Sequence, residues 1–170
     1  MLFLEKQNFA ENKQKYKKIS NYIKRNISSD LDIHHVGSTA IPNMYGKNII
    51  DILIGAKTNQ DFKIISDKLL ELGYYTKPYN QDSIYKFFSS RKEETTSGDS
   101  HIHLVIISSE RYKQFLYLKE YLLHNRDEAK KYSNFKLQLI KNGVDDRKKY
   151  KKIKSKYVDE LIKRAKKNEL

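Results

Sequence analysis

Apolar residues recur along this chain at two spacings, and each spacing predicts a different kind of element. A set near the N-terminus recurs close to the helical period of about 3.6 residues, which predicts a first helix. Its members are Phe9, Tyr16, Ile19, Ile23 and Ile27. Asn8 precedes the set and can cap this helix with its side-chain oxygen, and the polar residues 28–30 end it.

Two short strands are predicted on either side of a polar loop. Residues 31–36 form the first strand, and residues 37–46 form the loop. Residues 48–54 are apolar on both faces apart from Asp51. This pattern is typical of a central strand, because both faces of such a strand are covered.

The middle of the chain is predicted to complete a sheet. A second helix begins at Asn59 or Asp61 and ends at Gly73. Three further short strands are expected at residues 74–77, 84–89 and 101–107. The segment 91–99 is charged, contains several Ser and Thr residues and has no apolar anchor, so we expect a mobile loop there.

The last third of the chain is predicted to be helical. One helix covers residues 111–123, and Asn125 caps the next, which ends before Gly143. A final helix begins at Asp145 or Asp146 and has apolar residues along one side.

This order of elements predicts an α+β fold: a mixed sheet flanked by helices, followed by a C-terminal helical block. We expect residues 1–108 to form the sheet and its helices, and residues 109–170 to form the block, within one domain. A chain of 170 residues is long enough to bury a core without covalent staples. It contains no cysteine, which excludes disulfide frameworks, thiolate zinc sites and cysteine nucleophiles.

Basic residues are in large excess. The chain has 34 Lys and Arg against 21 Asp and Glu, a formal net charge of +13. Such a surplus favours anionic partners such as nucleotides, nucleic acid or acidic membrane surfaces. The alternative is that lysines merely solvate helix faces, since Lys outnumbers Arg, the usual residue for bidentate recognition of phosphate. We interpret the charge as a bias towards polyanions.

Membrane insertion is not expected. No apolar run approaches the ~20 residues needed to cross a bilayer. Residues 1–6 are too short and too soon charged to form a signal peptide. We therefore expect a cytoplasmic protein without a membrane partner, and the pattern does not predict an oligomeric state.

The turn after the first strand is a candidate anion site. Gly37 can adopt positive φ, which lets backbone N–H groups approach a phosphate closely. Ser38 and Thr39 add two hydroxyl groups. The alternative is an ordinary turn that ends a strand, since Gly-Ser pairs are common.

Asp51 is a sharper candidate. A lone carboxylate inside an apolar strand is costly to bury unless it is paired or binds a metal. It follows the Gly-Ser turn by a short loop, which favours a role beside a bound phosphate. The alternatives are a position at the sheet rim, or pairing with a lysine such as Lys47.

Two histidines form a third candidate group. On a strand, His101 and His103 point to the same face, and their apolar neighbours point to the other. Two such imidazoles can bind a metal, bind phosphate or move a proton. They can equally be hydrogen-bonded histidines on an open sheet face. His34 and His35 point to opposite faces of their strand, so only one of them can join the same pocket.

These segments together resemble a known family. The residues His35–Pro42, then Gly46 and Lys47, then Ile50–Ile52 resemble the signature of the GrpB family. The similarity continues in order along the chain, through Gly73-Tyr74, Phe87-Phe88, His101–Val105, Leu118–Leu122, Ala129–Tyr132, Phe135-Lys136, Tyr150 and Lys154. It spans nearly the whole sequence.

The resemblance implies a fold of the nucleotidyltransferase superfamily, in which the strand after the Gly-Ser loop carries Asp-x-Asp. Asp51 matches the first carboxylate, whereas Leu53 stands at the second position and cannot bind a metal. His101 and His103 stand where a later strand offers a third ligand. The resemblance thus implies Asp51, His101 and His103 as catalytic and metal-binding residues. Since magnesium prefers carboxylates to imidazole, the alternatives are one ion (magnesium, manganese or zinc) or a metal-free anion site.

Three functions remain open at this point. The first is transfer of a nucleotidyl group from a nucleoside triphosphate to a small acceptor. The second is a catalytically inactive module that binds a nucleotide, a CoA-like anion or RNA. The third is a hydrolase with histidine-bound metal, which the resemblance does not support. In the first two, the residues expected to hold the phosphates are His35, Gly37, Ser38, Thr39, Lys47 and Lys136.

Overall fold

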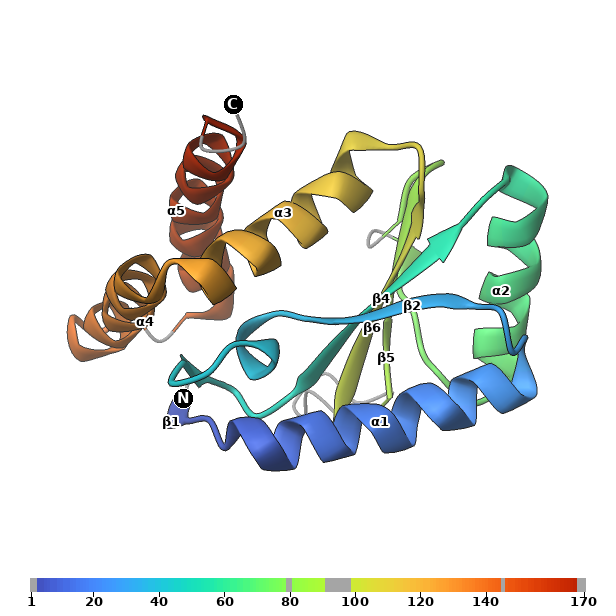
Figure 1. Ribbon diagram of the computed structural model, residues 1–170, viewed down its shortest axis with the longest axis horizontal. Helices are drawn as coiled ribbons and strands as arrows, with labels where there is room; N and C mark the ends of the chain where they lie inside the picture. The colour runs from blue at the N-terminus through green and yellow to red at the C-terminus, as the bar shows by residue number, and fades with distance from the viewer. Residues whose placement is uncertain (1–2, 79–80, 91–98, 145, 168–170) are drawn as a thin grey trace.

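A four-stranded mixed sheet lies at the centre of the computed structural model, which describes residues 3–78, 81–90, 99–144 and 146–167 (Figure 1). The strand order is β2-β4-β6-β5. The four strands are β2 (Asp32–Val36), β4 (Ile50–Ala56), β5 (Tyr85–Ser89) and β6 (Ser100–Ile106). The inner pair β4 and β6 is parallel, and each outer strand is antiparallel to its neighbour. The apolar strand that contains Asp51 is an inner strand, as its pattern predicts.

One face of this sheet is the main hydrophobic core. Alternate strand residues point towards it, because side chains on a strand alternate between faces. Those that are fully buried are Ile50, Ile52, Ile54, Phe88, Ile102 and Leu104. Two helices, α1 (Phe9–Asn26) and α2 (Asn59–Glu71), cover this face and contribute Ile23, Ile65 and Leu69 to the cluster.

Both of these helices begin at capping side chains. The Asn8 side-chain oxygen accepts a hydrogen bond from the backbone N–H of Glu11 at 3.2 Å, which confirms the predicted start of α1. Helix α2 begins at Asn59, and Thr58 and Asp61 form a reciprocal capping box in front of it.

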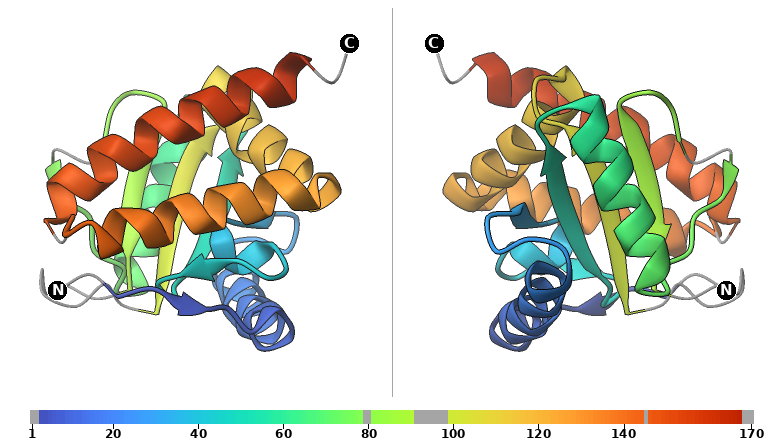
Figure 2. Two further views of the ribbon diagram at one scale, coloured as in Figure 1. Left: turned by 90° about the vertical axis from the view of Figure 1, so that its left-hand side faces the viewer. Right: turned by 90° about the vertical axis from the view of Figure 1, so that its right-hand side faces the viewer.

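Three helices form a block beyond the other face of the sheet. They are α3 (Glu110–His124), α4 (Arg126–Lys141) and α5 (Arg147–Lys167). Figure 2 shows α2 on one side of the sheet and α4 and α5 on the other. The block has a core of its own, in which Leu122, Tyr132 and Leu161 pack with Ile41 and Met44 from the loop after β2. The predicted α+β class, with a mixed sheet and a C-terminal helical block, is confirmed.

The loop between β2 and β4 contains structure that the sequence pattern did not predict. It begins with a 3₁₀ turn, η1 (Ser38–Ala40), and continues into a two-residue strand, β3 (Tyr45–Gly46). Strand β3 pairs with β1 (Glu5–Lys6) in a separate two-stranded sheet. Helix α4 also holds this loop, since the backbone N–H of Tyr45 donates a hydrogen bond to Ser133 Oγ at 2.7 Å.

Two predictions of local structure are wrong. The expected strand at residues 74–77 is reduced to one bridge, between Tyr75 and Ser89. Pro78 follows at once, and proline has no N–H with which to extend a ladder. Asn125 stands at the start of α4, but its side chain makes no capping bond and instead donates to the carbonyl of Tyr121 at 2.9 Å.

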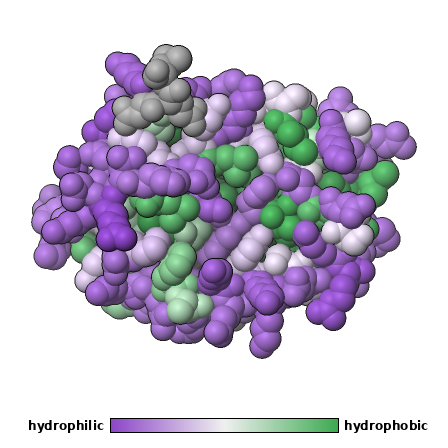
Figure 3. All heavy atoms as spheres, viewed as in Figure 1, coloured by the Kyte–Doolittle hydropathy of each residue, from purple (hydrophilic) through white to green (hydrophobic). Residues whose placement is uncertain are grey.

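The next features concern the predicted mobile loop, the surface and membrane insertion. Most of the predicted mobile loop, residues 91–98, lies outside the described residues. The surface seen in Figure 3 is predominantly hydrophilic, with apolar residues in small separate groups. Within the described part of the chain, every helix is too short or too polar to cross a membrane.

Candidate functional site

Part of the second face of the sheet carries polar and aromatic residues, whereas Val36, Leu53 and Val105 on the same face are buried with Tyr112 of α3. Asp51 on β4 lies directly beside His101 on the parallel strand β6, and Leu53 lies beside His103. Residues paired in this way point to the same face, so one carboxylate and two imidazoles come together. Phe87 on β5 lies next to His103 and contacts both imidazole rings at their edges. The prediction that His101 and His103 share a face is confirmed.

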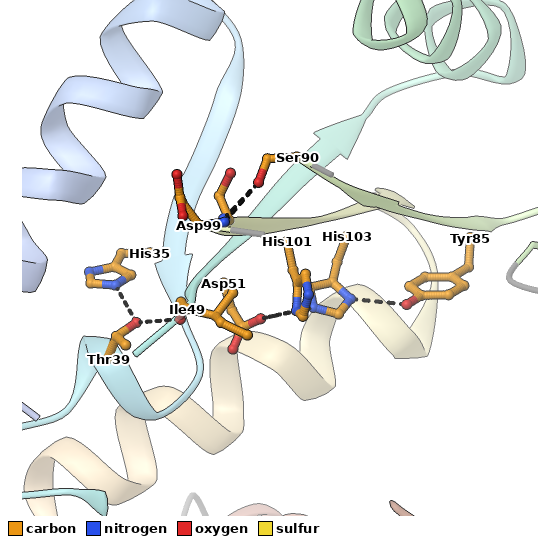
Figure 4. A network of polar contacts seen from close by, with 10 residues as sticks. His35, Thr39, Ile49, Asp51, Tyr85, Ser90, Asp99, His101 and His103 are labelled. Atoms are coloured by element: carbon orange, nitrogen blue, oxygen red, sulfur yellow. Dashed lines mark hydrogen bonds and ion pairs between the residues drawn. The ribbon is translucent and has the colours of Figure 1, made fainter. Parts of the chain in front are cut away.

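Asp51 contacts both histidines. Its Oδ1 atom lies 3.3 Å from His101 Nδ1 and 3.8 Å from His103 Nε2. The other ring nitrogen of His103 lies 3.0 Å from the hydroxyl of Tyr85, so a chain of polar contacts runs from Asp51 to Tyr85 (Figure 4). Of the alternatives for Asp51, the structure shows pairing, but with the histidines and not with Lys47.

The ionisation of this group follows from burial and mutual contact. Burial, the largest single influence, raises the pKa of the Asp51 carboxyl, but the contacts and charges of His101 and His103 together outweigh it and hold that pKa well below its usual range. Burial also lowers the pKa of His103, and the contact with Asp51 only partly opposes this. The arrangement therefore favours a charged carboxylate beside a neutral His103 near pH 7.

The Gly37 turn packs directly against Asp51. Gly37 has φ +73°, the positive value that its sequence context predicts. A Cβ atom at this position would collide with Asp51 Oδ2, far inside contact distance. Only glycine therefore permits both the backbone conformation and the close approach. The turn and Ser38 consequently stand beside the carboxylate.

These groups line a large basic cavity between the sheet and the helical block. Its volume is about 970 Å³. Two acidic residues, Asp51 and Asp82, are among its lining. The basic residues come from the loop, from α3, from α4 and from α5, and they include Lys47, Lys119, Lys136, Arg147, Lys151 and Lys154.

Lys136 is the most buried of these cations. It is 4% exposed, donates a hydrogen bond to the backbone carbonyl of Tyr45 and lies 4.9 Å from the centre of the Tyr132 ring. Burial, with the positive charge of Lys154, lowers its pKa to about 7. Lys47 lies over the ring of Tyr150 at 5.7 Å. Both lysines face the cavity, as their assignment to phosphate binding requires.

Two of the residues expected to hold phosphate lie elsewhere. His35 points to the core face of the sheet, where its ring stacks on Tyr16 at 4.7 Å. Its Nε2 atom lies 2.9 Å from Thr39 Oγ1, which is itself fully buried. Burial, with the charge of Lys119, lowers the pKa of His35 to about 4. Neither residue lines the cavity, and a neutral imidazole does not act as a cation, so the structure gives His35 and Thr39 a packing role.

His34 does not take the place of His35 in the cavity. It points to the same face as Asp51, but it lies further along β2, where its Nε2 atom lies 2.9 Å from Asp32 and 3.1 Å from the hydroxyl of Tyr112. The structure thus gives all five described histidines polar contacts, and places two of them, His101 and His103, in the cavity.

The structure adds residues that sequence reasoning missed. The sequence pattern does not mark Tyr85, which lies two residues from Phe87 on β5 and so points to the same face. On α5, Arg147, Lys151 and Lys154 are spaced four and three residues apart and therefore form one basic stripe facing the cavity. That spacing was visible in the sequence, but it was obscured by lysines on the other faces of the same helix.

The donor set does not match a metal centre. Within the described residues, no three His, Cys, Asp or Glu side chains are arranged to hold a metal ion. Leu53, at the second carboxylate position, is fully buried among Val36, Val105 and Tyr112. Magnesium requires several oxygen ligands, and Asp51 is the one carboxylate beside the histidines among the residues that the structure describes. The residues present therefore do not fit a resident two-magnesium site.

The fold and the cavity together define a class: an α+β protein with a basic pocket beside a glycine turn and a carboxylate–histidine cluster. Comparison with known proteins gives the family. Residues 6–164 match the family model described as GrpB protein, and this chain belongs to the GrpB family.

Curated relatives support this assignment. The chain is 30% identical over 133 residues to the glutamate-rich protein GrpB of Alkalihalophilus pseudofirmus, covering 77% of this chain and 76% of that protein. It is 31% identical over 138 residues to the UPF0157 protein YqkA of Bacillus subtilis. That match covers 81% of this chain but only 38% of YqkA, so this chain spans well under half of that relative.

A solved structure of the family agrees on the fold. The crystal structure of the conserved protein GrpB from Enterococcus faecalis is similar with a TM-score of 0.82, covering 98% of each chain at 21% identity. A weaker similarity, with a TM-score of 0.42 over 69% of this chain, is found to the Cid1 poly(U) polymerase with bound MgGTP. Similarity at that level leaves the function to be argued from the site itself.

Proposed function

We propose that the cavity binds a nucleotide or another small molecule that carries phosphate. The observation that carries this proposal is the Gly37 turn packed against Asp51, opposite lysines that face the same space. Backbone N–H groups at a glycine turn, a hydroxyl group from Ser38 and ammonium groups are the donors that phosphate oxygens accept from most strongly. The net charge of +13 favours the approach of such an anion.

The size of the cavity supports a small ligand. Pockets for small molecules and cofactors span roughly 300–1,000 Å³. At about 970 Å³, this cavity has room for a nucleotide. Its walls also carry aromatic rings, among them Tyr75, Phe87 and Phe115, which offer surfaces for a planar base. RNA is the alternative polyanionic ligand, and the test below distinguishes it from a nucleotide.

Isothermal titration calorimetry with ATP, CTP and dephospho-CoA tests the proposal, with adenosine as the ligand without phosphate. We expect binding of at least one phosphorylated ligand and none of adenosine. Ser38→Ala should weaken that binding by roughly three- to tenfold, because one hydrogen bond to a charged group is lost. Ser29→Ala, at an exposed serine distant from the cavity, should leave it unchanged.

Three results count against nucleotide binding. One is equal binding of ATP and adenosine. Another is an equal effect of the two serine variants. The third is binding of RNA alone, weakening steeply with salt, which would move the site from the cavity to the outer basic surface.

Nucleotidyl transfer is the second candidate, and the contact between Asp51 and the two histidines favours it. In such a step the hydroxyl oxygen of an acceptor forms a bond to the α-phosphorus, the bond from that phosphorus to the bridging oxygen breaks, and pyrophosphate leaves. The acceptor's proton passes to an imidazole, for which His101 is suited, because Asp51 holds its Nδ1 atom at 3.3 Å. Asp51 then stabilises the imidazolium that forms.

Release of pyrophosphate from a triphosphate, measured with magnesium, manganese or zinc in turn, tests this second function. A divalent ion that arrives with the triphosphate is part of the substrate. Asp51→Asn should lower turnover by about a hundredfold or more. Asp82→Asn, which removes a cavity carboxylate paired with Arg111 at 3.0 Å, is the matched control. Undiminished turnover in Asp51→Asn would remove Asp51 from the mechanism.

A further inference from the structure

Some lysines on the outer surface pair with carboxylates, whereas three lysines in the cavity do not. On the surface, Lys63 pairs with Asp67 at 3.1 Å, and Lys163 pairs with Glu160 at 2.8 Å. In the cavity, Lys47, Lys136 and Lys154 have no carboxylate within 4.0 Å among the residues that the structure describes. The cavity therefore holds more positive charge than its described carboxylates, Asp51 and Asp82, neutralise.

The three cavity lysines come from separate elements. Lys47 follows β3, Lys136 lies on α4 and Lys154 lies on α5. Their mutual effect is repulsive: after burial, the charge of Lys154 is the next cause that lowers the pKa of Lys136, and it also lowers that of Lys47. A fold that holds three such groups around one space is stabilised when an anion occupies that space.

We propose that Lys47, Lys136 and Lys154 form a subsite for the linked phosphates of a nucleoside triphosphate or another linear polyphosphate. This inference rests on the proposed function and narrows its ligand. One phosphate group carries about −1.5 to −2 charges, fewer than these three lysines supply. Arg147 and Lys151 on the same stripe of α5 add further positive charge. A chain of phosphates matches both the number of cations and their spread over three elements.

Lys136 is held in place before the ligand arrives. Its ammonium group donates one hydrogen bond to the carbonyl of Tyr45, which leaves two of its three N–H donors for phosphate oxygens. Tyr45 belongs to β3, and Gly46 beside it packs against Ser38 of the turn. The lysine subsite and the glycine turn are therefore connected through β3, so one ligand can contact both.

Binding of a polyanion to this subsite should take up protons. An anion favours the charged form of a lysine and so raises its pKa. Lys136 has a pKa of about 7 before binding, so near pH 7.5 it gains a proton on binding, and at pH 5.5 it already carries one. Among the described residues, the other ionisable groups around these lysines include Asp51 on β4, His101 and His103 on β6, Lys119 on α3, Tyr132 on α4, and Arg147, Lys148, Tyr150 and Lys151 on α5.

Calorimetry of the full chain with inorganic tripolyphosphate tests the subsite, in two buffers of different ionisation enthalpy at pH 7.5 and at pH 5.5. Lys154→Met should weaken binding at least about tenfold, since a charge-assisted hydrogen bond is lost. Lys152→Met removes the same charge from the exposed side of the same helix and should change binding by less than about threefold. Lys154→Arg keeps the charge and should retain most of the affinity.

The outcomes separate this inference from the proposed function. Selective loss in Lys154→Met, with more proton uptake at pH 7.5 than at pH 5.5, supports the subsite. A second outcome is that the two lysine variants weaken the binding of tripolyphosphate equally, or not at all, while nucleotides still bind. In that case the inferred subsite is wrong and the proposed function stands. If neither nucleotides nor tripolyphosphate bind the wild-type chain, both are wrong. Thermal unfolding followed by circular dichroism confirms that each variant is folded.

Discussion

The two faces of the central sheet are built from the same strands but hold very different groups. On the core face, fully buried Ile, Leu and Phe residues pack against α1 and α2. On the cavity face, the strands carry Asp51, His101 and His103, and basic residues from the helical block stand opposite. Adjacent residues of one strand thus contribute to a dry core on one side and to a charged cavity on the other.

This difference shows where stability and chemistry lie in the molecule. The core face fixes the strands and their register, because a slip by one residue would turn every buried side chain outward. The strands are then able to hold groups on the cavity face that repel one another or are costly to bury. Departures from ordinary burial rules are expected at functional sites, and here the carboxylate–histidine cluster lies on the cavity side of the sheet.

Neighbouring phenylalanines on β5 test this comparison with the largest expected effect. Phe88 is fully buried in the core, and Phe87 lines the cavity. Phe88→Ala should lower the free energy of unfolding by about 3–5 kcal/mol, because it leaves a void in the core. Phe87→Ala should cost only about 1 kcal/mol. Urea unfolding at pH 7 measures both, and equal losses would remove the distinction between the faces.

Gly37, in the turn beside Asp51, and Gly73, after α2, both have positive φ and so allow a matched comparison. Gly37 has φ +73° and packs against Asp51. Gly73 has φ +84°, and a Cβ atom added there would have no described atom from another segment within 4 Å. Gly73→Ala should cost about 1–2 kcal/mol from backbone strain alone. Gly37→Ala adds a steric clash, for a total of roughly 2–4 kcal/mol. It should also weaken phosphate binding, which Gly73→Ala should leave intact; thermal unfolding and calorimetry measure the two effects.

His35, the buried imidazole on the core face, gives a pH-dependent prediction. Its pKa is about 4 in the folded chain, below the ordinary value of 6.5, so the unfolded chain binds more protons between these values. The stability that neutral His35 contributes is therefore full above pH 6.5 and declines as pH falls towards 4. Between pH 7 and 4.5 the wild type should lose roughly 2–3 kcal/mol more than His35→Gln. Parallel losses in the two proteins, measured by urea unfolding, would show that His35 is not buried in neutral form.

The sequence predicted the core face better than the cavity face for physical reasons. A continuous apolar run locates β4, alternation locates β6, and helical spacing locates α1 and α2, because burial imposes these patterns on each element separately. The pairing of Asp51 with His101 depends on strand order, which no local pattern encodes. His35 and Thr39 were placed in the site because they flank the Gly-Ser turn, yet strand alternation turns His35 into the core. Lys154 is part of the family resemblance, but the pattern does not assign it to the site, because lysines occur on several faces of α5.

The central claim is that the cavity face holds the phosphates of a nucleotide. A crystal structure of the chain with a non-hydrolysable nucleoside triphosphate tests it most directly. We predict phosphate density between the Gly37 turn and the ammonium groups of Lys47, Lys136 and Lys154. Density for the nucleotide on the outer surface of α5, or an unchanged cavity at saturating nucleotide concentration, would contradict the account.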